Sequence, residues 1–485
     1  MKSFVFINLA IDCGYTGVNH GLAWLAPIVR ARGYDVTCIH LNQEISADEL
    51  IERVARLKPD IIGFSATTHQ LSYMKRYVES VQSMNALVIA GGVGVTLDPD
   101  WVMEHTLVNG ICIGEGEGPM KALLMRLEVC DNPAQTPGFW WREAGGSVRK
   151  NRPPPFVHDL DALEPPDYSF YDRQAVVSGE GHLFVMLSRG CPYNCFYCCN
   201  KALQGVYETG HGYFRVPTVE YSIRMIESLV RQYPETKVVE FEDDLLIANR
   251  DWFLEFAAQY QKRIGLPYRV CVRVECVKPD IVKSLKDSGC YRVLLGLESG
   301  SEDFRKKYLN RAYTNKMLVE KCQMLRRADL DLFTFNIVGF PLEGEAEMRD
   351  TLKLNMRAKP DGGVCTFFFP YKHTRLYEIC KEQGLLLDET ELSMITNYNS
   401  RPSIRMSEGL AKACVEYQRK ITDFIEYRRL LWRISHQSGS LPRPLKRFAS
   451  PAWYASFMKQ DSFVFCMARK AYHVCGLKRL MGCRG

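Results

Sequence analysis

The sequence predicts an α/β protein in which two parallel-strand units are followed by a helical region. Apolar strand-like runs alternate with helical stretches over residues 1–130 and again over 180–375, whereas residues 396–485 have the character of helices. Such alternation predicts parallel sheets covered by helices. A chain of 485 residues suits two or three domains, and 46% hydrophobic residues is an ordinary share for a globular protein.

Residues 1–130 are expected to form a flavodoxin-like (Rossmann-type) domain. Its strand-like runs are Phe4–Leu9, Asp35–Leu41, Asp60–Ser65, Ala86–Ala90 and Gly110–Ile113, with helical stretches near 20–32, 46–57, 70–83 and 99–106. Parallel sheets bind ligands beyond the carboxyl ends of their strands, and the loops after the last three strands are polar or glycine-rich. The candidate ligand positions on them are Ser65, Thr67, Gly91, Gly92, Gly114 and Glu115. Ordinary turn chemistry is the alternative explanation.

Residues 131–175 are expected to link this domain to the next. Trp140–Val148 suggests a hairpin, and the proline runs at 152–155 and 164–167 predict stiff, extended chain. Such a linker fixes how the two domains face each other.

Residues 176–395 are expected to form a partial (β/α)6 barrel. Strand-like runs at 183–188, 237–242, 268–275, 291–298, 331–338 and 363–369 alternate with helical stretches near 218–232, 251–263, 279–289, 315–328 and 345–358. Right-handed crossovers place the carboxyl ends of all six strands on one rim. Core packing would place apolar residues there, yet polar residues or glycine recur, including Asp243, Asp244, Arg273, Glu298, Asn336 and Gly339.

Three cysteines follow the first barrel strand. Cys191, Cys195 and Cys198 have C-x3-C-x2-C spacing. Three thiolates on one tight loop suit an iron–sulfur cluster that keeps one iron free for a ligand. Zinc is the alternative, but zinc usually takes four ligands from paired C-x2-C units, and no matched second pair is present. The adjacent Cys199 is interpreted as a buried neighbour, not a ligand.

The cysteine loop, with aromatic Tyr197 before its last cysteine, resembles the radical S-adenosylmethionine (radical SAM) superfamily. The resemblance implies that Cys191, Cys195 and Cys198 hold a [4Fe–4S] cluster whose fourth iron binds SAM. Reductive cleavage of SAM then yields a 5′-deoxyadenosyl radical.

The same resemblance assigns tasks on the barrel rim. Asp243 or Asp244 would meet the SAM ammonium, and Arg273 and Glu298 would contact its carboxylate and ribose. The backbone over Asn336–Pro341, including Gly339, would cradle adenine. The acidic pair is also consistent with capping the helix that follows.

Residues 1–130 resemble the cobalamin-binding domain that precedes many radical SAM barrels. The resemblance implies a corrinoid over the sheet, with its nucleotide tail between the Ser65 and Gly91 loops. Classical cobalamin domains carry Asp-x-His-x-x-Gly after the first strand, and the histidine ligates cobalt. Here that loop reads Asp12-Cys-Gly-Tyr-Thr-Gly17. Two interpretations stay open: a corrinoid bound without this ligand, which the resemblance favours, and a domain that has lost cobalamin.

The end of the chain, 396–485, is basic and aromatic. Residues 427–485 hold twelve Lys and Arg and one acid, Asp461, although the whole chain carries only +6. Three interpretations stay open: a helical cap on the barrel, contact with anionic lipid, and binding of nucleic acid, the last being disfavoured because no RNA-binding module is recognisable.

The compartment is predicted from cysteine use and hydropathy. Eighteen scattered cysteines suit reduced thiols and a cluster, not a disulfide framework. No apolar run reaches the length of a membrane span. The protein is expected in the cytoplasm, with peripheral membrane contact through the basic tail as a further hypothesis.

The resemblance predicts a cobalamin-dependent radical SAM enzyme that methylates an unactivated carbon or phosphorus centre. Related architectures also perform cyclisation and ring contraction, so a radical rearrangement without methyl transfer is one alternative function. A non-catalytic iron–sulfur or metal-binding protein is the second alternative. The expected partners are a small or lipid-like substrate, such as a hopanoid or a tetrapyrrole, and a flavodoxin- or ferredoxin-type electron donor. Cys365, Tyr371 and His373 are candidates for substrate contact, although packing explains each as well.

Overall fold

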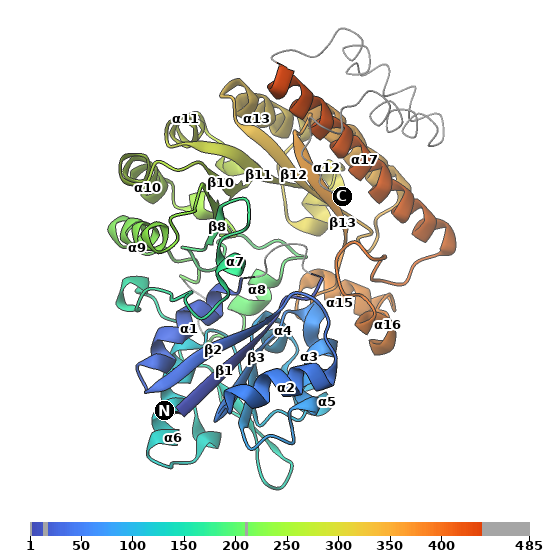
Figure 1. Cartoon of the computed structure of the whole chain (residues 1–485). Helices are drawn as coiled ribbons and strands as arrows, with labels where there is room; N and C mark the ends of the chain where they lie inside the picture. The colour runs from blue at the N-terminus through green and yellow to red at the C-terminus, as the bar shows by residue number, and fades with distance from the viewer. Residues whose placement is uncertain (1, 13–17, 209–211, 439–485) are drawn as a thin grey trace.

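The computed structural model describes residues 2–12, 18–208 and 212–438, and it contains two sheets, one in each of two stacked domains (Figure 1). The front domain, drawn mainly in blue, lies below the green-to-orange barrel, and α8 (Cys199–Gln204) lies where the two meet. The described part of the chain contains no helix that is long and apolar enough to cross a membrane.

The front sheet has seven strands in the order β2-β1-β3-β4-β5-β6-β7, of which the first five in the chain are parallel. These are β1 (Lys2–Leu9), β2 (Tyr34–Leu41), β3 (Ile61–Ser65), β4 (Leu87–Gly91) and β5 (Gly110–Cys112). The order β2-β1-β3-β4-β5 is the expected flavodoxin-like one. Strand β3 is buried along its whole length, as expected for a strand with both faces covered.

Six helices connect or flank these strands: α1 (His20–Arg30), α2 (Ala47–Leu57), α3 (Leu71–Ser80), α4 (Val93–Leu97), α5 (Pro99–His105) and α6 (Glu117–Glu128). Local sequence explains where two of them begin. Asn19 caps α1 by accepting from the backbone N–H of Leu22, and Ser46 caps α2 by accepting from that of Glu49.

The predicted hairpin is present as β6 (Phe139–Arg142) and β7 (Val148–Lys150), which pair antiparallel. Strand β6 also pairs with β5, so the hairpin extends the front sheet, which the sequence analysis did not anticipate. A short helix, α7 (Arg173–Val176), leads into the barrel.

The barrel is a six-stranded parallel sheet in simple sequence order, as predicted. Its strands are β8 (His182–Val185), β9 (Val238–Phe241), β10 (Tyr268–Val272), β11 (Cys290–Glu298), β12 (Asp331–Val338) and β13 (Gly362–Phe367). The helices outside it are α9 (Val219–Gln232), α10 (Arg250–Arg263), α11 (Pro279–Asp287), α13 (Asn315–Arg327) and α14 (Glu345–Ala358), with the short α12 (Glu302–Phe304) after β11.

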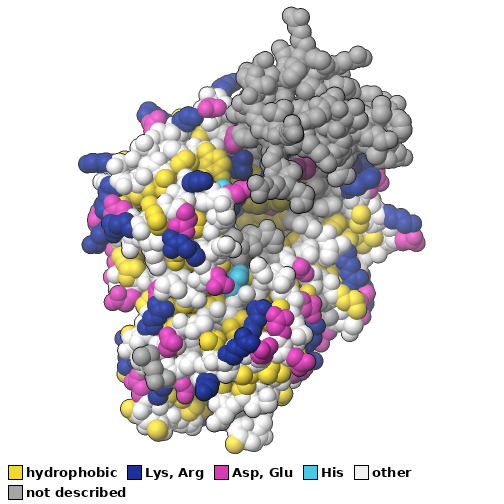
Figure 2. Space-filling view, viewed as in Figure 1, with side chains coloured by type: hydrophobic (Ala, Val, Ile, Leu, Met, Phe, Trp, Pro, Cys, Tyr) yellow, Lys and Arg dark blue, Asp and Glu magenta, His cyan; other side chains and the backbone are white. Residues whose placement is uncertain are grey.

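Three helices complete the described chain: α15 (Arg375–Glu382), α16 (Glu389–Ser393) and α17 (Glu408–Ser438). The first half of α17 packs on β13 and α14, where Cys414, Ile421 and Ile425 are buried with Cys365. The helices α8, α15 and α16 were not predicted. Acidic and basic side chains are interspersed over the face seen in Figure 2.

Gly300 lies where the chain after β11 crosses α14, because a Cβ there would overlap the backbone of Asp350. We expect Gly300→Ala to lower the free energy of unfolding by about 1–3 kcal/mol, since neither backbone can move away freely. Urea denaturation measures this. The control is Gly409→Ala in α17, where an added Cβ meets no atom within 4 Å. Equal losses in the two variants would contradict the close-packing argument.

Candidate active site

The cysteine loop lies between β8 and α8 at the carboxyl rim of the barrel, and its thiols are free. Within the described ranges, no three His, Cys, Asp or Glu side chains lie close enough together to hold one metal ion. The fit to an iron–sulfur cluster therefore rests on the donor set. Three thiols share one loop, and nitrogen donors face two of the sulfurs: Arg273 Nη1 lies 2.9 Å from Cys195 Sγ, and Asn200 Nδ2 lies 3.6 Å from Cys198 Sγ. Hydrogen bonds to ligand sulfurs are a usual feature of cluster sites.

The thiols of the cysteine loop differ in their electrostatic surroundings. A hydrogen bond with the adjacent Cys199 thiol lowers the pKa of Cys198, against the opposing effect of burial. Burial raises the pKa of Cys191 to about 12. The guanidinium of Arg273 supplies a positive charge beside Cys195, and such a charge stabilises a thiolate ligand.

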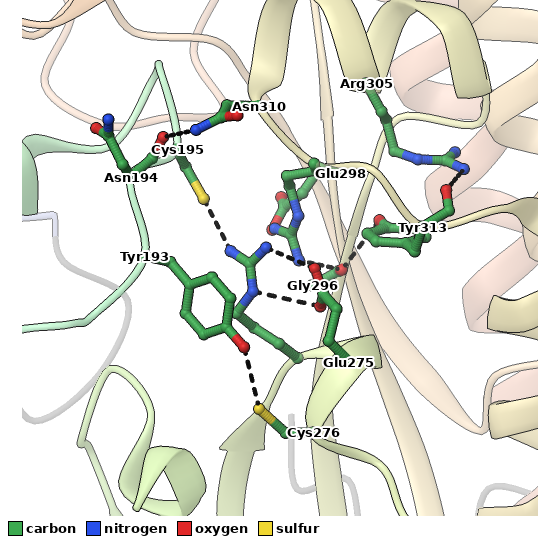
Figure 3. A network of polar contacts seen from close by, with 12 residues as sticks. Tyr193, Asn194, Cys195, Glu275, Cys276, Gly296, Glu298, Arg305, Asn310 and Tyr313 are labelled. Carbon is green, nitrogen blue, oxygen red and sulfur yellow. Dashed lines mark hydrogen bonds and ion pairs between the residues drawn. The ribbon is translucent and has the colours of Figure 1, made fainter.

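Two ion pairs, one partly buried and one buried, surround the loop (Figure 3). Arg273 pairs with Glu275 at 2.9 Å and stacks on the ring of Tyr193, 3.7 Å from its centroid. These contacts come from the cysteine loop and the end of β10, so they fix the loop to the barrel. Glu275 holds the pKa of Arg273 above its ordinary value although burial and the nearby Arg311 oppose this.

The second pair joins Glu298 at the end of β11 to Arg311. Arg311 Nη1 donates to Glu298 Oε1 at 2.7 Å and to the Tyr197 hydroxyl of the cysteine loop at 2.9 Å. The Glu298 backbone is left-handed, with φ +64°, and the strand register shifts between Gly296 and Glu298. Non-glycine residues in this conformation are strained and concentrate at functional sites. Arg311 belongs to no recognised motif, and the sequence analysis missed it.

The acidic pair after β9 has divided roles. Asp243 is buried and accepts hydrogen bonds from the Ser188 hydroxyl and from the backbone N–H groups of Leu187 and Ser188, so it holds the chain just before the cysteine loop. Burial raises its pKa to about 6, although these donors oppose the rise. Asp244 instead opens into a cavity described below. Of the two, Asp244 is the one that lines the cavity, where its carboxylate also accepts a hydrogen bond from the Asn200 side chain.

Asn336 and Gly339 lie at the end of β12. The Asn336 side chain faces away from the rim towards α14, where Asn355 Nδ2 donates to its Oδ1 at 2.7 Å. The backbone N–H of Gly339 donates to Glu343 at 2.6 Å. The predicted adenine contacts would therefore involve the remaining backbone groups of this segment, and they stay a prediction.

A cavity of about 530 Å³, here called the large cavity, lies between the two domains. All six predicted cobalamin positions line it: Ser65, Thr67, Gly91, Gly92, Gly114 and Glu115. From the barrel side it is lined by residues just before the cysteine loop, by α8 and by the end of β9, including Cys199, Glu242 and Asp244. Its volume falls within the range of about 300–1,000 Å³ typical of cofactor pockets.

The loops of the front sheet fit a large ligand. Gly92 has φ +99°, and a Cβ there would come within 2.8 Å of the Ala66 carbonyl oxygen, so only glycine suits this loop. A Cβ at Gly114 would come 2.5 Å from the hydroxyl of Tyr207, which reaches across from the barrel side. This hydroxyl accepts a hydrogen bond from the Glu115 backbone N–H at 2.7 Å. Without side chains at these two glycines, a planar or extended ligand can pack directly against the backbone of the loops.

Ion pairs join the domains around the large cavity. Arg189, two residues before Cys191, pairs with Glu117 at 2.5 Å and with Glu115 at 3.3 Å. Arg215 also pairs with Glu115. The Glu115 carboxylate is thus paired with two arginines. Neither arginine was identified from the sequence.

His20 lies on the same boundary. Its Nδ1 is 2.7 Å from the Tyr168 hydroxyl and its Nε2 is 3.0 Å from Glu242 Oε2, so both ring nitrogens are engaged. His20 lines the large cavity, but in this arrangement neither nitrogen is free to ligate a metal.

The remaining candidates fall outside the large cavity. Cys365 is buried against α17, and the Tyr371 hydroxyl is hydrogen bonded to that of Tyr398. His373 has a left-handed backbone, with φ +63°. Substrate contact by these three stays a prediction. Most of the basic tail, residues 439–485, lies outside the described residues, and so does the proposed lipid or nucleic-acid surface on it.

Family models match both domains of the chain. A B12 binding domain model matches residues 9–124, and a Radical SAM superfamily model matches residues 185–354. The first match covers β2 to β5 of the front sheet, and the second covers the barrel from the end of β8 into α14, in the predicted order.

Individual proteins match over most of the chain. An uncharacterized methyltransferase from Pyrococcus horikoshii is 27% identical over 83% of this chain and 88% of its own. An anaerobic magnesium-protoporphyrin IX monomethyl ester cyclase from Rubrivivax gelatinosus is 22% identical over 84% of this chain and 74% of its own. Among solved structures, the radical S-adenosylmethionine methyltransferase TsrM from Kitasatospora setae superposes with a TM-score of 0.66 at 16% identity, covering 87% of this chain and 83% of its own. At that identity the likeness shows the fold.

Proposed function

We propose that this chain, which belongs to the radical SAM enzymes that carry a B12 binding domain, transfers a methyl group to an unactivated carbon or phosphorus centre of a small molecule. The observation that carries the proposal is the large cavity, because its two walls are the loops of the B12 binding domain and the chain on either side of the cysteine loop. A methyl donor and a radical source would share one cavity there. Similarity to a protein named a methyltransferase supports the proposal.

An unactivated C–H bond is too strong for acid–base chemistry, so a radical route is required. When bound, the cluster and SAM supply a 5′-deoxyadenosyl radical, and cobalamin supplies the methyl group. In this proposal Cys191, Cys195 and Cys198 ligate the cluster, Arg273 donates to the Cys195 sulfur, and Asp244 accepts from the SAM ammonium. Asp243 acts indirectly, by holding Leu187 and Ser188.

The front domain would hold the corrinoid through the backbone of its strand-end loops. Gly91, Gly92 and Gly114 let a ligand approach closely, and Ser65 and Thr67 offer hydroxyls. Apolar side chains from both domains, among them Leu22 of the front domain and Leu187 of the barrel, line the rest of the large cavity. Apolar walls would limit the water that reaches a carbon radical there, which protects the radical from side reactions.

One observation favours a second function. Over 84% of its length this chain is similar to a magnesium-protoporphyrin IX monomethyl ester cyclase, which favours cyclisation or another radical rearrangement without methyl transfer. Either function needs a low-potential electron for the cluster, for which we infer a flavodoxin- or ferredoxin-type donor. A lipid-like substrate and peripheral membrane contact through the basic tail stay predictions.

Product analysis separates the two functions. We expect the anaerobically prepared full chain, given SAM, dithionite and its substrate, to release both 5′-deoxyadenosine and S-adenosylhomocysteine, because remethylation of the corrinoid consumes a second SAM. Liquid chromatography with mass spectrometry measures both. Formation of 5′-deoxyadenosine and altered substrate without S-adenosylhomocysteine would contradict methyl transfer and support rearrangement.

A variant of the front domain links this activity to cobalamin. We expect Gly92→Val to lose bound cobalamin but to retain iron and sulfide, because its side chain clashes with Ala66 on the front sheet and leaves the cysteine loop untouched. Visible spectra and cobalt analysis measure the loss. Cobalamin bound to Gly92→Val as tightly as to the unmodified chain would contradict the assignment of this loop.

A further inference from the structure

A second cavity, of about 190 Å³ and here called the small cavity, also lies between the domains. Its walls come from α3 and α5 of the front domain, from the segment after β13, and from the chain leading into and through α16. Figure 1 shows α15 and α16 beside α3 and α4, at the edge of the barrel rim. No sequence motif pointed to this cavity.

The small cavity adjoins the large one without being part of it. Thr67 and Thr96 line the large cavity, while the next residues along the chain, Thr68 and Leu97, line the small one. Phe369 on its barrel side follows β13, at the same carboxyl rim that carries the cysteine loop. A molecule that enters the small cavity therefore reaches the neighbourhood of the proposed chemistry.

The walls of the small cavity are mainly apolar. Trp101, Phe369, Leu386, Leu387 and Ile395 supply aromatic and branched aliphatic surface. An apolar cavity of about 150 Å³ is large enough to bind benzene, so about 190 Å³ holds one substituted ring or a branched hydrocarbon chain of similar size. The segment that forms one wall also exposes Met394, which is 63% accessible.

The charges at the small cavity do not favour an anion. Lys372 is paired with Asp98 at 2.7 Å, and Glu389 adds a further acid that lies 3.7 Å from His105. The basic group is therefore neutralised, while an acid remains at the rim. His69, the titratable ring in the wall, is 7% exposed, and burial lowers its pKa to about 4, so it is neutral at pH 7.

Two buried polar atoms in the wall are unsatisfied. Thr68 Oγ1 and His69 Nε2 are shielded from solvent and have no hydrogen-bond partner in the described structure. The His69 ring lies 4.4 Å from that of Phe369, centroid to centroid. Leaving a buried polar atom unpaired costs about 1–3 kcal/mol. Both atoms belong to residues that line the small cavity, so a side-chain rotation would bring them to a hydrogen-bonding group of a ligand.

We propose that the small cavity binds the uncharged, apolar end of the methyl acceptor, a benzene-sized ring or branched hydrocarbon group with a neutral hydrogen-bonding substituent. This inference rests on the proposed function, because it names the substrate class of that reaction. It excludes substrates whose buried end carries a phosphate or carboxylate. Thr68 and His69 receive the substituent, and the paired Lys372 and Asp98 set the preference against charge.

Equilibrium binding of a matched set of probes tests the inference without turnover. The probes are 4-methylbenzyl alcohol, 4-methylbenzoate and 4-methylbenzylamine, which share one ring and differ in charge, titrated into the cofactor-loaded full chain and followed by saturation-transfer NMR. We expect the alcohol to bind at least about tenfold more tightly than either ion. Tighter binding of the anion or the cation would overturn the inference.

Two variants locate the binding. Leu387→Trp fills the small cavity and is expected to weaken alcohol binding at least about tenfold, whereas Val129→Trp adds the same ring to an exposed site on the front domain and is expected to leave it unchanged. Asp98→Asn leaves Lys372 uncompensated and is expected to shift the preference towards 4-methylbenzoate. Circular dichroism and cobalamin content verify folding.

The failures of the two proposals are distinguishable. Equal alcohol binding by Leu387→Trp and the unmodified chain, or an unchanged charge preference in Asp98→Asn, would overturn the small-cavity inference while leaving release of 5′-deoxyadenosine and S-adenosylhomocysteine intact. Conversely, selective binding of the alcohol without formation of S-adenosylhomocysteine would overturn the proposal of methyl transfer. The small cavity would then stand as a binding site for a neutral ligand.

Discussion

Replacing Cys195 with alanine is expected to abolish release of 5′-deoxyadenosine from SAM and dithionite. Cys195 is the buried member of the cysteine trio and faces the Arg273 guanidinium at 2.9 Å. Without its thiolate, one iron of the cluster loses its protein ligand, and a buried arginine loses its sulfur partner. Release of 5′-deoxyadenosine should fall to that of a mixture without protein, with a matching fall in iron and acid-labile sulfide.

The adjacent cysteine supplies the matched comparison for this variant. Cys199→Ala is expected to retain iron and sulfide, because Cys199 begins α8 and lines the large cavity instead of facing Arg273. Iron analysis and the visible spectrum decide between the two positions. A Cys195→Ala protein that kept its iron while Cys199→Ala lost it would show that the cluster uses a different trio.

The second large effect is expected at Arg311. Arg311→Met should lower the free energy of unfolding by about 3–5 kcal/mol, because it leaves the buried Glu298 carboxylate without its partner. The two side chains are only 3% and 10% exposed. Loss of the Arg311 donor also frees the Tyr197 hydroxyl in the cysteine loop, so we expect faster loss of iron to a chelator. Urea denaturation and chelation kinetics measure the two effects.

An exposed ion pair provides the comparison for the loss of stability expected at Arg311. Arg250 pairs with Asp280 at 2.5 Å, but the two side chains are 47% and 36% exposed. Arg250→Met is therefore expected to cost less than about 1 kcal/mol. If Arg311→Met were no more destabilising than Arg250→Met, the buried pair would not support the loop as described.

Features that repeat locally were predictable from the sequence. The alternation of strands and helices predicted both sheets and their strand order. The six loop positions predicted at strand ends all line the large cavity, and their contact with cobalamin stays a prediction. The spacing of Cys191, Cys195 and Cys198 predicted the radical SAM barrel that the family model matches. In each case the information lies within a few residues along the chain.

Features that depend on distant partners were not predictable. Arg189 meets Glu117 across 72 residues, and His20 meets Glu242 across 222, so no local pattern reveals either pair. Asp243 and Asp244 are neighbours of identical chemistry, and only the fold shows that one holds backbone while the other opens into the large cavity. The small cavity was missed because α15 and α16, which help to enclose it, were not predicted.

The ion pairs between the domains have a consequence for how such proteins recombine. A chimera that takes its front domain from a relative inherits positions 20, 115 and 117 from one parent and positions 189, 215 and 242 from the other. A mismatch at position 115 or 117 leaves Arg189 or Arg215 opposite a group that does not neutralise it, and an uncompensated buried charge costs several kcal/mol. A mismatch at position 20 or 242 breaks the contact between His20 and Glu242. The two domains should therefore be inherited as one unit, and shuffled libraries should recover function chiefly where these six positions come from the same parent.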